Sequence, residues 1–277
     1  MTEHSDDVFA LLVLENGDLA SGSADKTIKI WDTNEGIVKQ TLTGHESRIR
    51  DLKSVEKNCL ISASDDKTIK IWDIATATAI KTLQEHSGGV RSLALLKNGD
   101  LASGSEDSTV NIWSLNTAKL KRTLIGHTGD VWALVVLDNG DLASGATDKT
   151  IKIWNVDSGM VKRTLAVHTD DVFVLIKLGN GDLVSGSLDS SIKICNTEDG
   201  EVKKSFTGHG DYVTALKQLE NGDLISGSND GTIKVWSLED GTMKRSIKVN
   251  LEVWSMEMLK NGYLVCGCKN GTIKIWE

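Results

Sequence analysis

Apolar and polar positions alternate along the chain in short segments separated by turns. The predicted strands of the first stretch are 8–14, 19–23, 27–31 and 37–43. Between the first two lies Asn16-Gly17, a pair that favours a tight hairpin turn. The third is rich in β-branched residues, which favour strands. The pattern therefore predicts four antiparallel strands in about 40 residues, a unit typical of one propeller blade.

This unit recurs along the whole chain. The six histidines lie 41 residues apart, at His4, His45, His86, His127, His168 and His209, and Asn250 takes the seventh place. A strict interval of this length is the signature of a repeat architecture. We expect one all-β domain over 1–277, a seven-bladed β-propeller of four-stranded antiparallel blades. Its repeats are approximately 4–44, 45–85, 86–126, 127–167, 168–208, 209–249 and 250–277.

The seventh repeat is shorter than the others. Six repeats have a recognisable fourth strand, whereas the seventh ends its third strand at Trp276, one residue before the end of the sequence. Only three residues precede His4. The sequence therefore predicts either a seventh blade without its outer strand, leaving an edge that can pair with another strand, or a fragment of a longer polypeptide.

Four residue types recur at matching positions of the repeats. The order His, Ser, Asp, Trp, with Ile-Trp-Asp endings at Trp31-Asp32 and Trp72-Asp73, resembles the WD-repeat (WD40) family over essentially the whole chain. The resemblance implies a hydrogen-bonded structural network within each blade. Its members would be His4, Ser21, Asp25 and Trp31; His45, Ser62, Asp66 and Trp72; His86, Ser103, Asp107 and Trp113; and His127, Ser144, Asp148 and Trp154. The network departs from the pattern at Cys195 in repeat five, and at Asn250, Cys266 and Asn270 in repeat seven, where we expect it to be broken.

Physical chemistry also favours a structural role for these polar positions. A buried aspartate persists only when it is paired and hydrogen-bonded, and a histidine together with a tryptophan N–H can satisfy such a network. Every histidine occupies a repeat position, so none is left over for catalysis or for a metal. The chain has no glycine-rich phosphate loop, nucleophile elbow or metal-ligand spacing. We therefore expect no enzyme, no cofactor and no metal.

The composition of the chain limits the classes of molecule that it is expected to bind. The formal net charge is −8 and basic residues are spread out, which argues against sequence-independent nucleic-acid binding. No apolar run approaches the roughly 18 residues that span a bilayer, and residues 1–7 carry no targeting signal. Cys266 and Cys268 share a strand face, but no second ligand pair is near, so packed thiols in a reducing compartment are expected. We expect an intracellular protein, cytoplasmic rather than nuclear, without a membrane, nucleic-acid or small-molecule ligand.

One position varies in chemistry while the fold pattern stays constant. It follows the first valine or isoleucine of each repeat and reads Phe9, Arg50, Arg91, Trp132, Phe173, Thr214 and Trp254. An unpaired arginine cannot be buried in a blade core, so the position is expected to reach solvent and to expose its aromatic residues. The resemblance to the WD-repeat family implies that this position lies on the top face around the central channel, where partners dock. The predicted rim adds Arg48, Asp130, Asp171 and Tyr212.

The leading hypothesis is a non-enzymatic interaction scaffold that binds proteins or peptides on this face, because exposed Trp, Tyr and Arg are typical of interface hot spots. One alternative is that these side chains only plug the channel or pack on the next blade. A second is that Arg48, Arg50 and Arg91 bind phosphorylated peptides, as in WD-repeat substrate receptors of ubiquitin ligases, although Asp65 and Glu106 could neutralise them. A third is a purely architectural subunit of a larger assembly.

Overall fold

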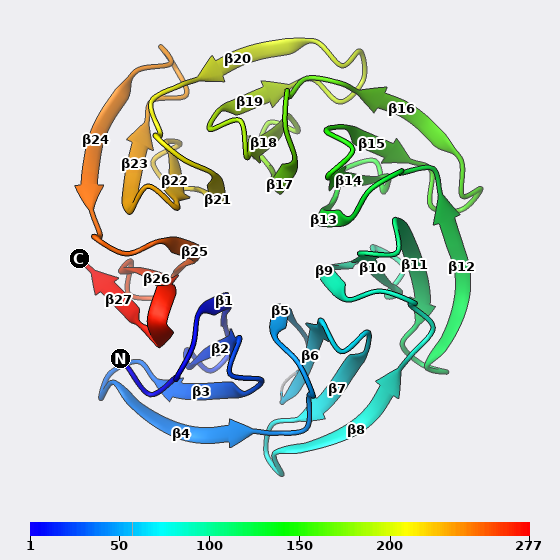
Figure 1. Ribbon diagram of the computed structural model, residues 1–277, viewed down its shortest axis with the longest axis vertical. Coiled ribbons are helices and arrows are strands. Elements are labelled where there is room, and N and C mark those ends of the chain that lie inside the picture. Colours follow the sequence, from blue (N-terminus) through cyan, green and yellow to red (C-terminus); the bar gives the residue numbers. More distant parts are fainter. Residues whose placement is uncertain (57) are drawn as a thin grey trace.

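The computed structural model describes residues 1–56 and 58–277 and forms seven antiparallel sheets arranged as a ring (Figure 1). Blades one to three consist of β1 Val8–Val13, β2 Leu19–Ser23, β3 Ile28–Asp32 and β4 Ile37–Leu42; β5 Ile49–Glu56, β6 Cys59–Ser64, β7 Ile69–Asp73 and β8 Thr78–Leu83; and β9 Val90–Leu95, β10 Leu101–Ser105, β11 Thr109–Ser114 and β12 Lys119–Ile125. Blades four and five consist of β13 Val131–Val136, β14 Leu142–Ala146, β15 Ile151–Trp154 and β16 Val161–Leu165; and β17 Val172–Lys177, β18 Leu183–Ser187, β19 Ile192–Cys195 and β20 Val202–Phe206. Blades six and seven consist of β21 Val213–Gln218, β22 Leu224–Ser228, β23 Thr232–Trp236 and β24 Met243–Lys248; and β25 Val253–Met258, β26 Leu264–Cys268 and β27 Ile273–Trp276.

The predicted fold class is confirmed. Six sheets have four strands paired in sequence order, the seventh has three, and the first strand of every blade lines the centre while the outer strands form the circumference (Figure 1). Within blade one, Leu19 pairs with Val13 on one side and with Trp31 on the other. Gly17 turns the first hairpin at φ 90°, a left-handed conformation that glycine adopts without strain.

The hydrophobic core lies between neighbouring blades rather than within each sheet. One buried cluster, for example, joins Ala102 and Val110 of blade three to Val131 and Trp154 of blade four. The approach is close enough to require glycine, because a Cβ on Gly104 would lie 2.7 Å from Cγ1 of Val131. Since each blade is covered by its neighbours on both sides, its inner strands are apolar on both faces.

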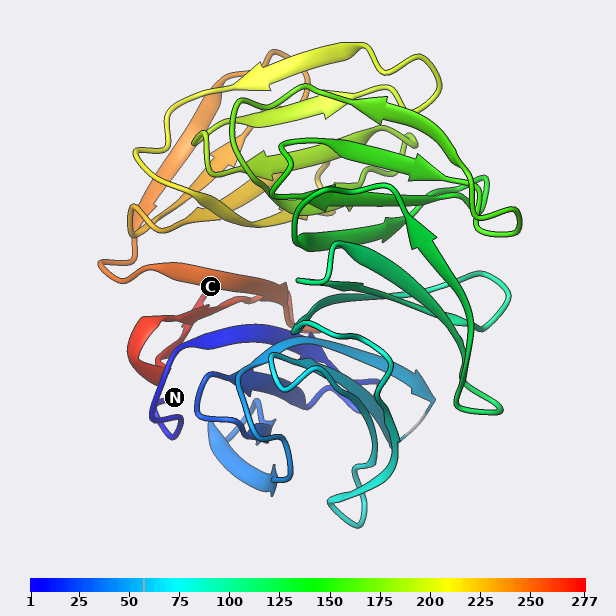
Figure 2. The same ribbon diagram turned by 45° about the vertical axis from the view of Figure 1, so that its right-hand side comes forward.

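The ring closes where the two chain ends meet. Met1 exchanges two backbone hydrogen bonds with Ile273 of β27, at 3.2 Å and 2.9 Å. Met1 thereby takes the place that Leu42 takes opposite Ile28 in blade one. Figure 2 shows both ends at this junction between blades seven and one. Blade seven is three-stranded, as the sequence predicts.

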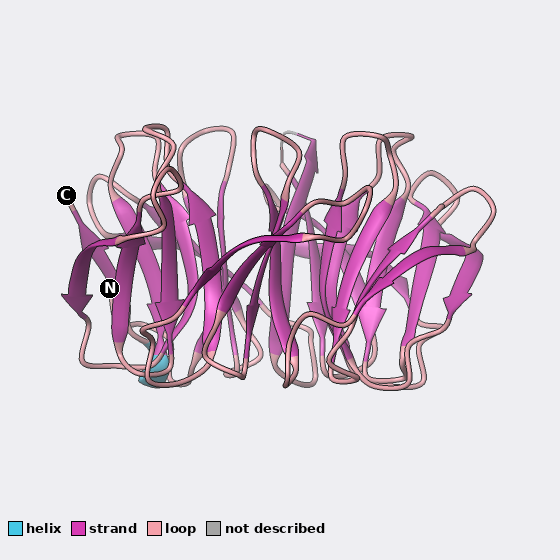
Figure 3. Cartoon of the chain, turned by 90° about the horizontal axis from the view of Figure 1, so that it is seen from above, coloured by secondary structure: helices cyan, strands magenta, loops and turns pink. Residues whose placement is uncertain are grey.

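The single short helix of the described residues, η1 (Lys269–Gly271), connects β26 to β27. It marks the face that carries two kinds of loop: those between the second and third strands of a blade, and those that lead from one blade to the next. We call this the mouth face; it is the lower side in Figure 3. Among the described residues, no helix is long and apolar enough to cross a membrane.

Candidate functional site

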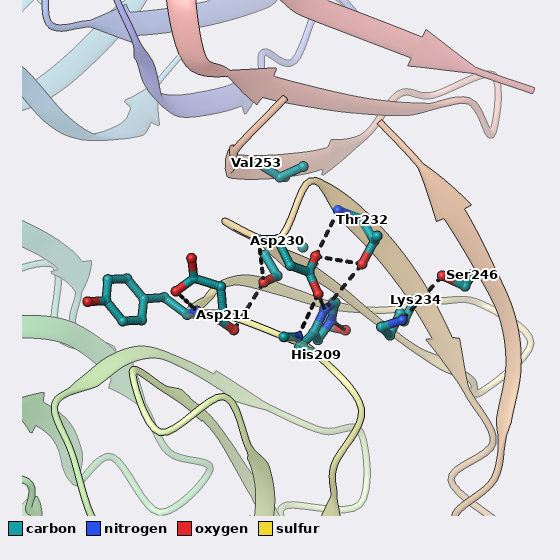
Figure 4. A network of polar contacts seen from close by, with 12 residues as sticks. His209, Asp211, Asp230, Thr232, Lys234, Ser246 and Val253 are labelled. Atoms are coloured by element: carbon teal, nitrogen blue, oxygen red, sulfur yellow. Dashed lines mark hydrogen bonds and ion pairs between the residues drawn. The ribbon is translucent and has the colours of Figure 1, made fainter. Parts of the chain in front are cut away.

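Six blades contain a histidine–aspartate pair bonded to a buried serine. In blade six, His209 Nδ1 lies 2.9 Å from Asp230 Oδ2 (Figure 4). Its Nε2 lies 2.7 Å from Ser226 Oγ, which accepts a hydrogen bond from Trp236 Nε1. An ionised carboxylate only accepts, so Nδ1 carries the proton and Nε2 accepts from the serine hydroxyl. The same bonds, all between 2.6 and 2.9 Å, join the four predicted sets of blades one to four.

The electrostatics of these networks are those of a closed structural unit. Burial opposes ionisation of Asp230, but hydrogen bonds from Thr232, the Gly210 N–H and His209 outweigh it and lower the Asp230 pKa to about 2. Burial lowers the pKa of the histidines in blades four, five and six. Ser226 is fully buried and already accepts from the Trp236 indole, so a substrate cannot reach this hydroxyl, and we assign these residues to the fold.

Blades five and seven depart from the network as the sequence indicates. Cys195 replaces the tryptophan, is fully buried, and has its pKa raised to about 11 by burial. In blade seven the sulfur atoms of Cys266 and Cys268 lie 3.1 Å apart in the core. Within residues 1–56 and 58–277, no group of three or more His, Cys, Asp or Glu side chains could hold a metal ion.

The variable position of each first strand converges at the centre of the ring. Its members line a cavity of about 260 Å³ in the central channel. Trp132 stacks on Phe173 with ring centroids 4.7 Å apart, and Phe173 lies 6.5 Å from Trp254, which meets the edge of Phe9 at 5.1 Å. Aromatic pairs at such separations attract one another beyond the area they bury. The four rings therefore form one continuous cluster.

Two arginines complete this cluster, and here the sequence expectation was wrong. Arg50 lies 4.3 Å from the Phe9 ring and Arg91 lies 4.4 Å from the Trp132 ring. Their side chains are only 11% and 8% exposed, because they are not unpaired: Asp65 accepts from Arg50 at 2.8 Å and from Arg91 at 2.6 Å. Glu106 forms a further ion pair with Arg91.

The aromatic residues of the cluster are therefore half-buried rather than exposed. Thr214, in the same position of blade six, is buried and donates to the backbone carbonyl of Val253. The expectation that the whole position reaches solvent fails because carboxylates from the next loops satisfy the arginines. The alternative hypothesis, that these side chains only fill the channel, is correct for the burial of the two arginines and the threonine.

The rim residues lie around this cluster on the mouth face. Arg48 is exposed and Tyr212 is 41% exposed, whereas Asp130 and Asp171 are half-buried. The backbone carbonyl of each rim residue accepts a hydrogen bond from the loop between the second and third strands of its own blade, as Asp130 does from Thr147 at 2.9 Å. This tie holds the rim at a fixed height above the cluster.

Arg50 and Arg91 are poorly placed to bind phosphate. Each fork already contacts carboxylates, so a phosphate would have to displace Asp65 or Glu106. Burial and the neighbouring Arg50 charge lower the Arg91 pKa to about 10. This shows that the two guanidiniums repel each other and that Asp65, shared between them, is needed to hold them together.

The family model of the WD domain, G-beta repeat, matches residues 1–32, 36–73, 77–114, 118–155, 200–237 and 241–277. The unmatched stretch contains Cys195, where the repeat pattern fails. Among solved structures, the crystal structure of the WD40 beta propeller domain of Doa1 is similar, with a TM-score of 0.88 and 29% identity, over 100% of this chain and 94% of that chain.

Proposed function

Because the chain belongs to the WD40 repeat family, whose propellers are generally non-catalytic scaffolds for protein interactions, we propose that it binds a partner protein on its mouth face. The observation that carries the proposal is the convergence of Phe9, Trp132, Phe173 and Trp254 from four different blades. Side chains brought together only by ring closure give a face that no single repeat could offer.

The physical character of the face supports the same function. Half-buried aromatic rings beside a cavity of about 260 Å³ offer apolar area that a partner can cover, and the exposed ring of Tyr212 stands at its edge. Aromatic anchors surrounded by polar rim residues are the usual composition of binding hot spots. The backbone ties of the rim keep the face rigid, which lowers the entropy cost of association.

Photocrosslinking from the chain's two tyrosine positions tests the proposal. A photoreactive phenylalanine analogue would replace Tyr212 on the mouth face or, as a matched control, Tyr263, which lies in a first-hairpin turn on the opposite face. We expect partners from a cell extract to crosslink from position 212 and to be lost when Trp254→Ala is added. Equal crosslinking from both faces, or crosslinking from position 263 alone, would contradict the assignment.

A further inference from the structure

The buried arginines on one side of the mouth face are paired with carboxylates, whereas two carboxylates on the other side have no ion pair among the described residues. On blades two and three, Asp65 and Glu106 neutralise the two buried arginines. On blades four and five, Lys149 lies 3.8 Å from Asp170, while Asp130 and Asp171 have no ion pair among the described residues. A cationic group is therefore the complement that this half of the face lacks.

The two carboxylates also repel each other. Burial raises the pKa of Asp171, the neighbouring negative charges of Asp170 and Asp130 raise it further, and the positive charge of Lys149 offsets these effects only in part. A positive charge placed beside Asp171 would relieve that repulsion, so the electrostatics of the loop agree with the charge balance of the face.

Each of these carboxylates stands two residues before an aromatic ring. Asp130-Val131-Trp132 and Asp171-Val172-Phe173 occupy equivalent places on adjacent blades, and the two rings stack at an interplanar angle of 23°. We call these two segments the acidic–aromatic step. A lysine or arginine side chain has an aliphatic stem that packs on apolar surface and a charged end that needs a carboxylate, and the step presents both.

Donor groups without acceptors line the same cavity. Nε of Arg91, on a side chain only 8% exposed, has no hydrogen-bond partner among the described residues, and neither has Nε1 of Trp132 or of Trp254. All three nitrogens are shielded from solvent, so they are unmet polar groups in the wall of the cavity rather than contacts that a ligand makes without rearrangement.

We propose that the acidic–aromatic step binds a basic side chain, lysine or arginine, of a peptide segment of the partner, and this inference rests on the proposed function. The charged end of the side chain lies between Asp130 and Asp171, and its stem covers the stacked rings. Asp130 also attracts the Arg91 guanidinium, but Arg91 makes its direct ion pairs with Asp65 and Glu106, and these reduce its repulsion of the ligand.

Nuclear magnetic resonance of the indole N–H groups tests the proposal on the intact chain. The eight tryptophans give eight indole signals, and the probes are acetyl-Gly-Arg-Gly-amide, its lysine and norleucine counterparts, and n-butylammonium. We expect the arginine and lysine peptides to shift the signals of Trp132 and Trp254 in a saturable way. The norleucine peptide, which lacks the charge, is expected to bind at least about tenfold more weakly, and butylammonium, which has the charge without the rest of the peptide, is also expected to bind more weakly.

Charge variants identify the carboxylates responsible. Asp130→Asn/Asp171→Asn is expected to weaken the arginine peptide about tenfold, from roughly threefold for each half-buried pair. The matched control, Asp157→Asn/Glu198→Gln, makes the same charge change in exposed loops of the opposite face and is expected to leave the affinity unchanged. The unaltered indole signals of the blade networks verify that each variant is folded.

Three outcomes would overturn the proposal: equal binding of norleucine and arginine peptides, equal losses in the two charge variants, or tighter binding of an acidic or phosphorylated peptide. Salt gives a second measurement, because the affinity of the unmodified chain is expected to fall when sodium chloride is raised from 50 to 300 mM. If crosslinking from position 212 succeeds while the peptides show no preference for basic residues, the proposed function stands and this inference fails.

Discussion

Removal of the central serine of a blade network is expected to cost more in blade four than in blade five. In blade four, Ser144 Oγ accepts from Trp154 Nε1 at 2.7 Å and donates to His127 Nε2 at 2.7 Å. In blade five, Ser185 lies 2.7 Å from His168 Nε2, but Cys195 stands where the tryptophan would be. The same substitution therefore leaves two buried groups unsatisfied in one blade and one in the other.

The magnitude follows from this difference. Both serines are fully buried, so solvent cannot replace the lost hydroxyl, and each buried group left unsatisfied costs about 1–3 kcal/mol. We expect Ser144→Ala to lower the free energy of unfolding by about 3 kcal/mol and Ser185→Ala by about half as much. Urea unfolding followed by far-ultraviolet circular dichroism measures both, provided that the slope with denaturant is unchanged.

A double-mutant cycle isolates the indole hydrogen bond. In a Trp154→Phe background the donor is absent, so Ser144→Ala is expected to cost only as much as Ser185→Ala does in the unmodified chain. Equal losses for the two serine variants in the unmodified chain would refute the reasoning, because they would mean that the Trp154–Ser144 bond contributes nothing to stability.

Three further predictions follow from individual contacts. Cys195→Trp is expected to destabilise the chain by about 1–3 kcal/mol through overpacking. In blade four, a Cβ on Gly126 would lie 3.0 Å from the Trp154 ring, and the position of Gly126 is taken by Val167 one repeat later. Adding Val167→Gly is expected to recover the loss, and a denaturation midpoint that stays low in the double variant would contradict this. Asp65→Asn is expected to cost about 3 kcal/mol because it leaves the buried Arg50 without its carboxylate and Arg91 with Glu106 alone. The control Asp138→Asn, at a 64% exposed carboxylate, is expected to change stability little; similar thermal midpoints for the two variants would disprove the prediction. Stability is expected to fall as the pH decreases from 7.5 to 5. Burial lowers the pKa of the histidines in blades four to six in the folded chain. Because an unfolded histidine has an ordinary pKa of about 6.5, the unfolded chain binds more protons than the folded chain over this range. The lowered aspartate pKa values of the networks add a further loss at lower pH, and urea midpoints that stay level across this range would exclude the effect.

The fold could be predicted from the sequence because its determinants recur in each repeat. Strand lengths, turn glycines and the polar network depend on contacts within one blade or with the adjacent blade. Each repeat therefore confirms the interpretation of the others. The three-stranded seventh blade was one of the two outcomes that the shorter seventh repeat predicted.

The candidate site was only partly predictable, because its chemistry depends on contacts between repeats. Arg91 of blade three pairs with Asp65 of blade two, 26 residues earlier in the chain. Each residue alone has the appearance of an exposed charge, and only the packing of blade two against blade three brings the two together. The sequence signal for this pairing is that blades two and three each carry an acid at the loop position and an arginine at the variable position. The sequence indicates Asp65 and Glu106 as possible partners of the arginines, but it does not reveal that the pairing buries them.

The same pairing changes which half of the mouth face is available for binding. Read as a sequence, the face has a basic side and an acidic side of similar strength. In the structure, Arg50 and Arg91 are paired with carboxylates and only the exposed Arg48 of the three arginines has no ion pair among the described residues. Asp130 and Asp171 lie without an ion pair beside the stacked rings of Trp132 and Phe173. A partner is therefore selected by the charges that remain unpaired after folding, and the unpaired carboxylates beside apolar rings favour a basic peptide segment over a phosphorylated one.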